Sequence, residues 1–235
     1  MISVSSNLVT SSHPHNKIAL LFFAHSAESD LRAKGIGNLQ LFESLTQHTQ
    51  QVIENSAIPY FHFSEFEQKG ASFGERLANA FEVLFAKGYD GVISVGNDCP
   101  HISVKLLKQA KQKLETQQMV VGPTYDGGTY LIGMHKSQFS KRDFESLPWQ
   151  KAQLFNALIS YFKPFGTVFR LETYFDLDTL EDAKHLVGFI KTLKQYLITL
   201  LTQLVGSTHS MVSFEPELRA QLVPSFQFNK GSPFS

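Results

Sequence analysis

The stretch GVISVGNDCP, from Gly91 to Pro100, is the part of the sequence that decides the fold. Its opening residues, GVISV, predict a strand that stops at Gly96. Asp98 follows directly, at the predicted carboxyl end of that strand. Ligands of open α/β sheets bind beyond the carboxyl ends of the strands. This stretch therefore predicts a strand and, next to it, the place of a site.

Strands and helices are predicted to alternate on both sides of this stretch. The run IALLFFA at residues 18–24 is continuously apolar, which is typical of a strand buried on both faces of a parallel sheet. The alternation favours an α/β domain with a mostly parallel sheet. The other predicted strands are residues 58–63, 119–121, 130–134 and 167–171, and the predicted helices are residues 38–53, 73–85, 104–115, 151–162 and 180–205.

Length and composition narrow the class of protein. A chain of 235 residues, 43% of them hydrophobic, is long enough for one domain with a sizeable core. Lys and Arg number 21, as do Asp and Glu, so no basic excess is available to neutralise nucleic-acid phosphates. The single cysteine excludes an intramolecular disulfide framework and a multi-cysteine zinc site. We expect a cytoplasmic protein that does not bind nucleic acid.

The two ends of the chain differ from the middle. Residues 1–16 predict a flexible tail without the basic and apolar regions of a secretory signal. Residues 17–206 predict the domain with its C-terminal helix, and residues 207–235 an extended tail. Lys191 and Lys194 interrupt the leucine-rich helix, which argues against a membrane span. Its apolar stripe either packs on the domain or forms a homodimer interface.

Asp98 is the first candidate site residue. A carboxylate at a strand end can hold a divalent cation that neutralises a diphosphate, and Mg²⁺ and Mn²⁺ prefer such oxygen ligands. The preceding residue is Asn97, so one carboxylate stands here where Asp-x-Asp motifs carry two. The alternative is that Asp98 only caps a turn before Pro100.

A turn with two glycines is the second candidate. Asp126, Gly127 and Gly128 permit positive φ angles and a close approach of the backbone to a ligand. Asp126 could contact sugar hydroxyls, orient an acceptor or share the metal. The alternative is an ordinary hairpin turn, because Asp-Gly is a turn signal by itself.

The third candidate is a predicted helix start with Gly74, Glu75 and Arg76. Backbone N–H groups and the helix dipole favour anions at such an end. Arg76 could pair with a phosphate, and Glu75 could position it or a ribose hydroxyl. The alternative is a local Glu–Arg pair on a solvated helix face.

Two further segments carry charged groups. Arg32 and Lys34 are predicted in a loop after the first strand, where a nucleotide phosphate would sit in a doubly wound fold. Asp176 and Asp178 alternate on an extended segment, so both point to one side and could complete a metal site. Asp178 or Thr179 could instead cap the helix that follows.

Four segments together resemble a known family. They are SFGERLANAFEVLFAKGYDGVISVGNDCPHIS, VVGPTYDGGTYLIGM, LPWQKAQLFNALI and FDLDTLEDAKHL. In order and spacing they resemble a bacterial family of glycosyltransferase-A-like proteins, the selenodomain-associated transferases of type 1, over about residues 18–186. Phospholactate guanylyltransferases and molybdopterin nucleotidyltransferases are similar at a greater distance.

The resemblance implies a three-layer α/β/α sandwich with a Rossmann-like sheet of the nucleotide-diphosphosugar transferase type. It implies a nucleotide bound through a divalent metal, with Asp98 as metal ligand, Asp126-Gly127-Gly128 as the acceptor-side turn and Gly74-Glu75-Arg76 near the cleft. The first loop departs from the family, and His101 stands where the family commonly has an acidic residue. The candidate binding residues of the first loop in this chain are Glu28, Arg32, Lys34 and Asn38.

Three functions follow as hypotheses. The first is a metal-dependent transferase that moves a glycosyl group from a nucleotide sugar, with Asp126 orienting the acceptor or acting as base. The second is a nucleotidyltransferase, which would use the same cleft and metal on a nucleoside triphosphate. The third is an inactive binding module that keeps the scaffold, suggested by the single carboxylate and the altered first loop.

Overall fold

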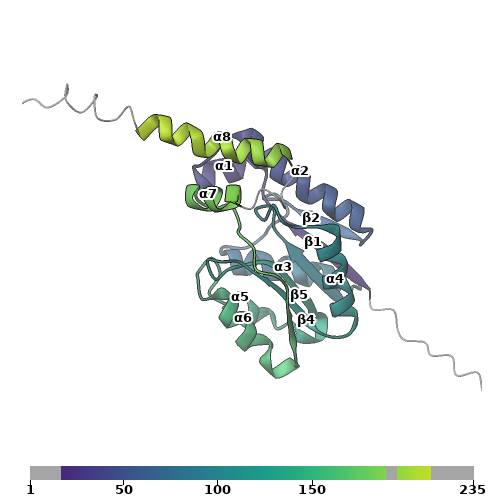
Figure 1. Cartoon of the computed structure of the whole chain (residues 1–235). Coiled ribbons are helices and arrows are strands. Elements are labelled where there is room, and N and C mark those ends of the chain that lie inside the picture. The colour runs from purple at the N-terminus through teal and green to yellow at the C-terminus, as the bar shows by residue number, and fades with distance from the viewer. Residues whose placement is uncertain (1–16, 189–194, 213–235) are drawn as a thin grey trace, which may run out of the picture.

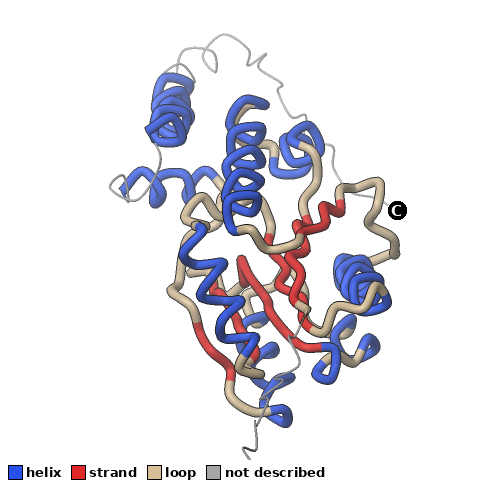
Figure 2. Tube along the Cα trace, turned by 90° about the vertical axis from the view of Figure 1, so that its right-hand side faces the viewer, coloured by secondary structure: helices blue, strands red, loops and turns tan. Residues whose placement is uncertain are grey.

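The computed structural model describes residues 17–188 and 195–212. In this part, six strands form one sheet in the order β2-β1-β3-β5-β4-β6, with helices on both sides (Figure 1, Figure 2). The predicted three-layer α/β/α sandwich with a mostly parallel sheet is therefore confirmed. The strands are β1 (Ile18–Phe23), β2 (Tyr60–Phe63), β3 (Gly91–Val95), β4 (Met119–Pro123), β5 (Thr129–His135) and β6 (Val168–Arg170).

One strand runs against the others. β5 pairs antiparallel with both β3 and β4, whereas β1 is parallel to β2 and β3, and β4 is parallel to β6. The short connection through Asp126-Gly127-Gly128 explains this, because a tight turn can join only antiparallel neighbours. The alternative prediction of an ordinary hairpin turn at Asp126, Gly127 and Gly128 is thus correct for the backbone.

The helices cover both faces of the sheet and one of its ends. α2 and α4 pack on one face, and α3, α5 and α6 pack on the other. Every residue of β1 is buried, as its continuous apolar run predicts. The helices are α1 (Ala27–Lys34), α2 (Leu39–Ser56), α3 (Phe73–Ala86), α4 (Val104–Glu115), α5 (Lys141–Glu145), α6 (Leu154–Phe162), α7 (Leu180–Gly188) and α8 (Gln195–Val212).

The prediction of a loop around Arg32 and Lys34 is wrong, because both residues lie in helix α1. The Ser26 hydroxyl accepts the Ser29 N–H at 3.3 Å and caps the start of this helix. Gly35, at φ 63°, ends it. The sequence contains both the capping serine and the terminal glycine. A helix of eight residues is too short, however, for its apolar residues to show a clear helical periodicity.

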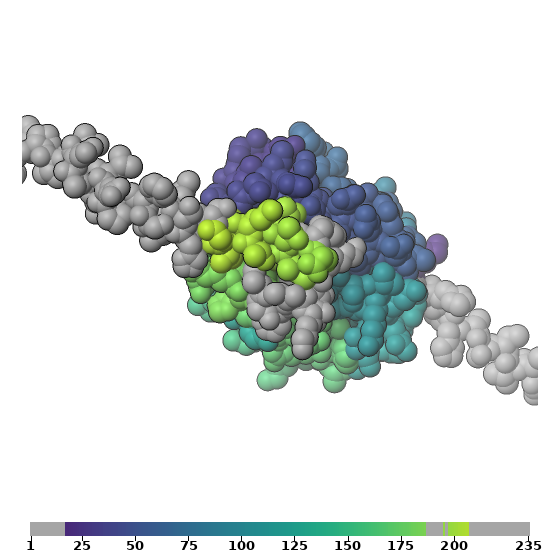
Figure 3. All heavy atoms as spheres, turned by 45° about the horizontal axis from the view of Figure 1, so that its top comes forward, coloured from purple at the N-terminus to yellow at the C-terminus, as the bar shows by residue number. Residues whose placement is uncertain are grey.

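The C-terminal helices form a third cluster with α1 and α2. The structure has α7 and α8 where one helix is predicted, and residues 189–194 between them lie outside the described part. Leu186, Leu197 and Leu201 are fully buried in this cluster. α8 lies across α1, α2 and α7, on the outside of the molecule (Figure 1, Figure 3). The predicted apolar stripe of the C-terminal helix therefore packs on the domain. A homodimer through α8 stays a prediction.

The predicted tails fall mostly outside the described residues. This holds for residues 1–16 and 213–235. α8 continues to Val212, past the predicted domain limit at residue 206, because no proline interrupts the helix before Pro216. Among the helices of the described residues, none is long and apolar enough to cross a membrane.

The cap of α7 gives a direct stability prediction. The Thr179 hydroxyl accepts the Asp182 N–H at 3.2 Å, and an Asp182 carboxylate oxygen accepts the Thr179 N–H at 2.7 Å. Thr179, rather than Asp178, is therefore the capping residue. Thr179→Ala is expected to lower the free energy of unfolding by about 1 kcal/mol, and Thr179→Ser to leave it nearly unchanged. Urea denaturation measures both, and equal losses in the two variants would contradict the capping role.

Candidate functional site

A cavity of about 560 Å³ opens at the carboxyl ends of β1 and β3. The start of β5, helix α1, the first turn of α3 and the segment before α6 complete its walls. This is the position at which open α/β sheets bind ligands. Its charged lining residues are Asp30, Lys34, Arg76, Asp98, Asp126, Lys151, Asp176 and Asp178.

The two acidic motifs singled out in the sequence meet in this cavity. Asp98 follows β3, Asp126 lies in the turn between β4 and β5, and both line it. Backbone hydrogen bonds tie the later acidic segment to both motifs. The Leu177 N–H donates to the Asp98 carbonyl at 2.9 Å, and the Tyr125 N–H donates to the Tyr174 carbonyl at 3.1 Å. Asp176 and Asp178 are thereby brought into the same site.

Lys34 supplies a positive charge to the part of the cavity around Asp98, Asp176 and Asp178, here called the acidic end. Its ammonium lies 2.7 Å from Asp178 Oδ1 and 3.5 Å from Asp98 Oδ2, and it donates to the Leu177 carbonyl at 2.7 Å. Burial alone would lower the pKa of Lys34, but Asp98 and Asp178 outweigh burial and raise it above its ordinary value. Lys34 therefore stays charged and links α1 to the segment after β6.

Asp176 is half-buried beside the other aspartates of the cavity. Burial, followed by the charges of Asp98, Asp126 and Asp178, raises the pKa of Asp176 to about 8. Burial also raises the pKa of Asp178, against the opposing effect of Lys34. At neutral pH the Asp176 carboxyl is thus largely protonated.

The shifted pKa of Asp176 predicts a pH dependence of stability. A group whose pKa is raised on folding stabilises the fold at low pH, and that contribution is lost as the pH rises from about 4 towards about 8. Asp176→Asn cannot ionise, so it should become more stable than the wild type across this window. The gain at pH 8 should be at least about 1 kcal/mol, the equivalent of one pKa unit.

Thermal unfolding at pH 5 and pH 8 checks this expectation. The matched control is Glu43→Gln, which neutralises an exposed carboxylate on α2. If Asp176→Asn and the wild type lose the same stability between the two pH values, the assigned protonation of Asp176 is wrong.

Asp126 is oriented through one of its two oxygens. Oδ1 accepts the Thr124 hydroxyl and, at 2.9 Å, the Gly128 N–H. Within the described residues, Oδ2 has no hydrogen-bond partner. The fixed carboxylate therefore keeps an oxygen that can accept a hydrogen bond from a ligand in the cavity.

The side-chain amide of Asn97 donates its hydrogen bonds within the protein. Its amide donates to Asp30 Oδ2 at 2.8 Å and to Thr46 Oγ1 at 2.9 Å, which uses both of its N–H groups. Asp30 is buried, and burial raises its pKa although the hydrogen bond from Asn97 opposes this. Asn97 lines the cavity as predicted, but only its carbonyl oxygen is left for a ligand.

Of the three residues predicted at the start of α3, one lines the cavity and the other two lie behind it. Arg76 lines the cavity, whereas Gly74 and Glu75 do not. A Cβ on Gly74 would lie 2.4 Å from Trp149 Cδ1, so the absence of a side chain lets the indole pack against α3. Glu75 Oε2 accepts the Ala71 N–H at 2.7 Å and holds the loop before the helix.

Three other predicted binding residues lie outside the cavity lining. Arg32 is exposed on α1, and Asn38 caps α2 by accepting the Leu41 N–H at 2.9 Å. Gly127, at φ 90°, packs against the backbone of Ala152. Direct ligand contacts of these three residues stay predictions, and Gly128 is the glycine of the turn that lines the cavity.

Some lining residues are ones that the sequence does not single out. Trp149 packs against the core, and it also lines the cavity with Lys151. His25 and Gln68, which hydrogen-bond at 3.0 Å, line the cavity as well. Trp149 and Lys151 lie in the segment LPWQKAQLFNALI of the family resemblance, but no site role is predicted for them, and His25 and Gln68 lie in none of the four segments. Cys99 is buried, and burial raises the pKa of its thiol.

The donor set of the acidic end suits a hard divalent cation. Asp98, Asp126 and Asp176 offer carboxyl oxygens, and the charges of Asp98, Asp126 and Asp178 add to burial in raising the pKa of Asp176. Nowhere in residues 17–188 and 195–212 do three His, Cys, Asp or Glu side chains form a ready metal cage. A cation here would therefore take ligands from water and from a bound phosphate as well.

Comparison with known proteins places the chain in a family. A family model described as "Uncharacterized protein conserved in bacteria (DUF2064)" matches residues 29–151, more than half of the chain. The chain belongs to the DUF2064 family. The matched part of this DUF2064 protein contains Asp98, Asp126 and the first turn of α3. No curated protein sequence matches significantly.

Solved structures show which fold this DUF2064 protein has. A "putative nucleotide-diphospho-sugar transferase" from Desulfovibrio desulfuricans G20 superposes with a TM-score of 0.66 at 22% identity, covering 80% of this chain and 95% of that chain. Rv0371c from Mycobacterium tuberculosis H37Rv gives a TM-score of 0.50 at 12% identity, covering 73% and 97%. The predicted nucleotide-diphosphosugar transferase fold is confirmed.

Proposed function

We propose that the protein is a transferase that takes a nucleotide-activated sugar and moves the glycosyl group to an acceptor, with Mg²⁺ or Mn²⁺ as cofactor. The observation that carries the proposal is the shared cavity of Asp98 and Asp126 at the strand ends. The fold supports it, since the similar Desulfovibrio protein is described as a nucleotide-diphospho-sugar transferase. Fold alone does not fix a function, so the argument depends on the site.

The end of the cavity around Asp98 is proposed to hold the diphosphate of the donor. Asp98 would hold the cation, which when bound stabilises negative charge on the departing diphosphate. The Lys34 ammonium, 2.7 Å from Asp178, adds a fixed positive charge to this end. Arg32 and Asn38 are proposed to act on the nucleotide from α1 and the start of α2.

Asp126 is proposed to orient the acceptor. Its Oδ1 is held by Thr124 and Gly128, so Oδ2 can accept the hydrogen bond of an acceptor hydroxyl and take the proton when the new bond forms. Gly128 is proposed to contact the ligand, and its lack of a Cβ, which would lie 2.9 Å from Thr124 Oγ1, leaves room for the hydrogen bond between Thr124 and Asp126. Gly127, Gly74 and Glu75 are proposed to act by fixing the wall behind it.

Product analysis tests the proposal against its alternatives. The protein is incubated with Mn²⁺ and either a nucleotide sugar labelled in the sugar or a nucleoside triphosphate labelled in the α-phosphate. Release of nucleoside diphosphate from the nucleotide sugar, dependent on Asp126, supports glycosyl transfer. Pyrophosphate release with label retained on a product contradicts it and assigns a nucleotidyltransferase. Binding without turnover of either contradicts it and assigns an inactive module.

A further inference from the structure

The cavity has a second charged end, opposite in sign to the first. Arg76, in the first turn of α3, and Lys151, before α6, both line it. Within residues 17–188 and 195–212, neither side chain forms an ion pair with a carboxylate. Arg76 Nε is buried and has no hydrogen-bond partner there. A buried guanidinium nitrogen without a partner is costly unless a ligand supplies the acceptor.

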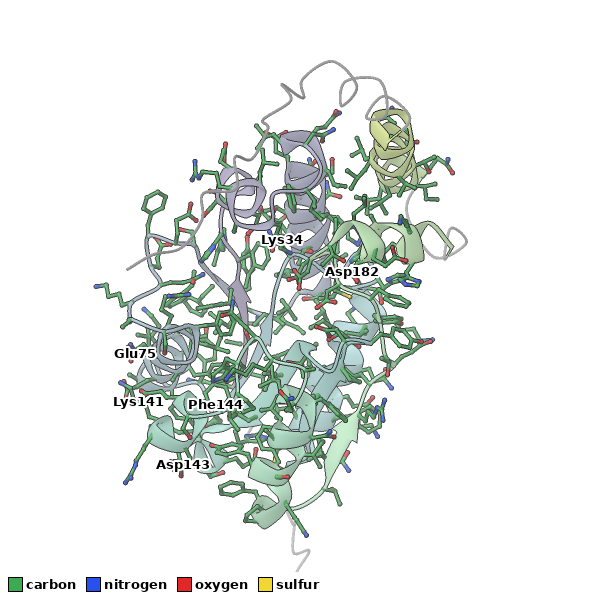
Figure 4. The ribbon with its side chains drawn as sticks, turned by 90° about the vertical axis from the view of Figure 1, so that its left-hand side faces the viewer. Lys34, Glu75, Lys141, Asp143, Phe144 and Asp182 are labelled. Atoms are coloured by element: carbon green, nitrogen blue, oxygen red, sulfur yellow. The ribbon has the colours of Figure 1, made fainter. Side chains whose placement is uncertain are left out.

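The two cations of the basic end come from other elements than Lys34, the cation beside Asp98 and Asp178. Lys34 of α1 lies 2.7 Å from Asp178, whereas Arg76 lies in the first turn of α3 and Lys151 lies before α6. Figure 4 shows where Lys34 of α1 and Glu75 of α3 lie. Lys34 lies near Asp182 of α7, whereas Glu75, the neighbour of Arg76 in the chain, lies apart from them beside Lys141.

The basic end adjoins the turn that carries Asp126. The Phe155 N–H donates to the Gly127 carbonyl at 3.0 Å, and a Cβ on Gly127 would lie 2.1 Å from the Ala152 carbonyl oxygen. Lys151 precedes Ala152, so this backbone packing holds Lys151 next to the turn. The charge of the basic end therefore lies on the proposed acceptor side of the cavity.

A fixed aromatic wall accompanies the two cations. The indole of Trp149 donates to the Phe144 carbonyl at 2.9 Å and packs on Gly74 of α3. Phe73 contacts it with ring centroids 5.6 Å apart. Such a wall excludes water from one side of an ion bound by Arg76, which strengthens charge-assisted hydrogen bonds.

We propose that Arg76 and Lys151 form a subsite for an anionic group, a phosphate or a carboxylate, on the acceptor. The inference rests on the proposed transferase function and names the class of its acceptor as anionic. Arg76 offers N–H donors in a fork that matches either anion, and Lys151 adds a point charge. The same chemistry could come from the phosphates of the donor, and the experiment separates the two sources.

Inorganic phosphate is the probe for this subsite. It is titrated into the full chain at constant ionic strength, and binding is followed by ³¹P NMR. Arg76→Met and Lys151→Met are each expected to weaken phosphate binding about tenfold, the loss of one charge-assisted interaction. Arg142→Met, which removes the same charge from an exposed position on α5, should leave it unchanged. Circular dichroism confirms that each variant is folded, and Lys151 is exposed enough for its variant to fold even if Arg76→Met does not.

A second titration separates acceptor from donor. With a nucleoside diphosphate and Mg²⁺ at saturation, phosphate should still bind, because its subsite is distinct. Displacement of phosphate by the nucleotide would overturn the proposal, as would equal phosphate binding in the wild type and in both variants. If the nucleotide fails to bind while phosphate still depends on Arg76, the donor proposal fails and the anion subsite stands.

Discussion

Asp98→Asn is expected to abolish the binding of Mn²⁺ that depends on a nucleoside diphosphate. The variant keeps the shape of the side chain but removes the charge that faces the cavity beside Lys34. Because no ready cage of three ligands surrounds the position in the described residues, the cation depends on Asp98 and on phosphate oxygens. Loss of the charged ligand should weaken binding by about 100-fold or more.

Electron paramagnetic resonance of free Mn²⁺ measures this loss directly. The matched control is Asp143→Asn, which makes the same change on α5, outside the cavity. The control should bind Mn²⁺ and nucleotide as the wild type does. Undiminished binding by Asp98→Asn would show that the cation is held elsewhere, and the assignment of Asp98 as metal ligand would be wrong.

Gly127→Ala is expected to have the largest effect on stability. Gly127 has φ 90°, and a Cβ there would lie 2.1 Å from the Ala152 carbonyl oxygen. Left-handed backbone costs an alanine about 1–2 kcal/mol, and the overlap with packed backbone adds a similar amount. The free energy of unfolding should therefore fall by about 3 kcal/mol.

Gly88→Ala separates the two contributions. Gly88 has φ 87°, nearly the same backbone angle, but a Cβ there would meet no atom within 4 Å. Chemical denaturation of both variants should show a clearly larger loss for Gly127→Ala. If the two losses are equal, the turn does not pack on Ala152 as tightly as described, and the wall next to Asp126 is less fixed than the proposed function requires.

The strands and long helices were predictable because their apolar patterns are local. GVISV gives β3 at Gly91–Val95, and the spacing after Ser103 gives α4 at Val104–Glu115. Helix α1 was not predictable in the same way, since its periodicity is weak and tertiary contacts of Lys34 help to hold it. The antiparallel direction of β5 required knowing that the turn at Asp126 joins adjacent strands.

The site was predictable only where a strand end or a turn marks it. Asp98 and Asp126 follow such signals, and the cavity joins them. Trp149 and Lys151 lie in a segment of the family resemblance, but no strand end or turn marks them or Gln68 as site residues, because they reach the cavity through packing of segments distant in the chain. Conversely, Asn38 carries a strong local signal, yet its side chain serves as a helix cap.

Calorimetric titration of the full chain with a panel of nucleotides and nucleotide sugars, with and without Mn²⁺, tests the central claim most directly. The claim is that the hollow between the two acidic motifs accepts an activated nucleotide. We expect at least one nucleotide sugar to release or absorb heat only when Mn²⁺ is present. Absence of heat across the whole panel, in a protein shown to be folded, would contradict the account.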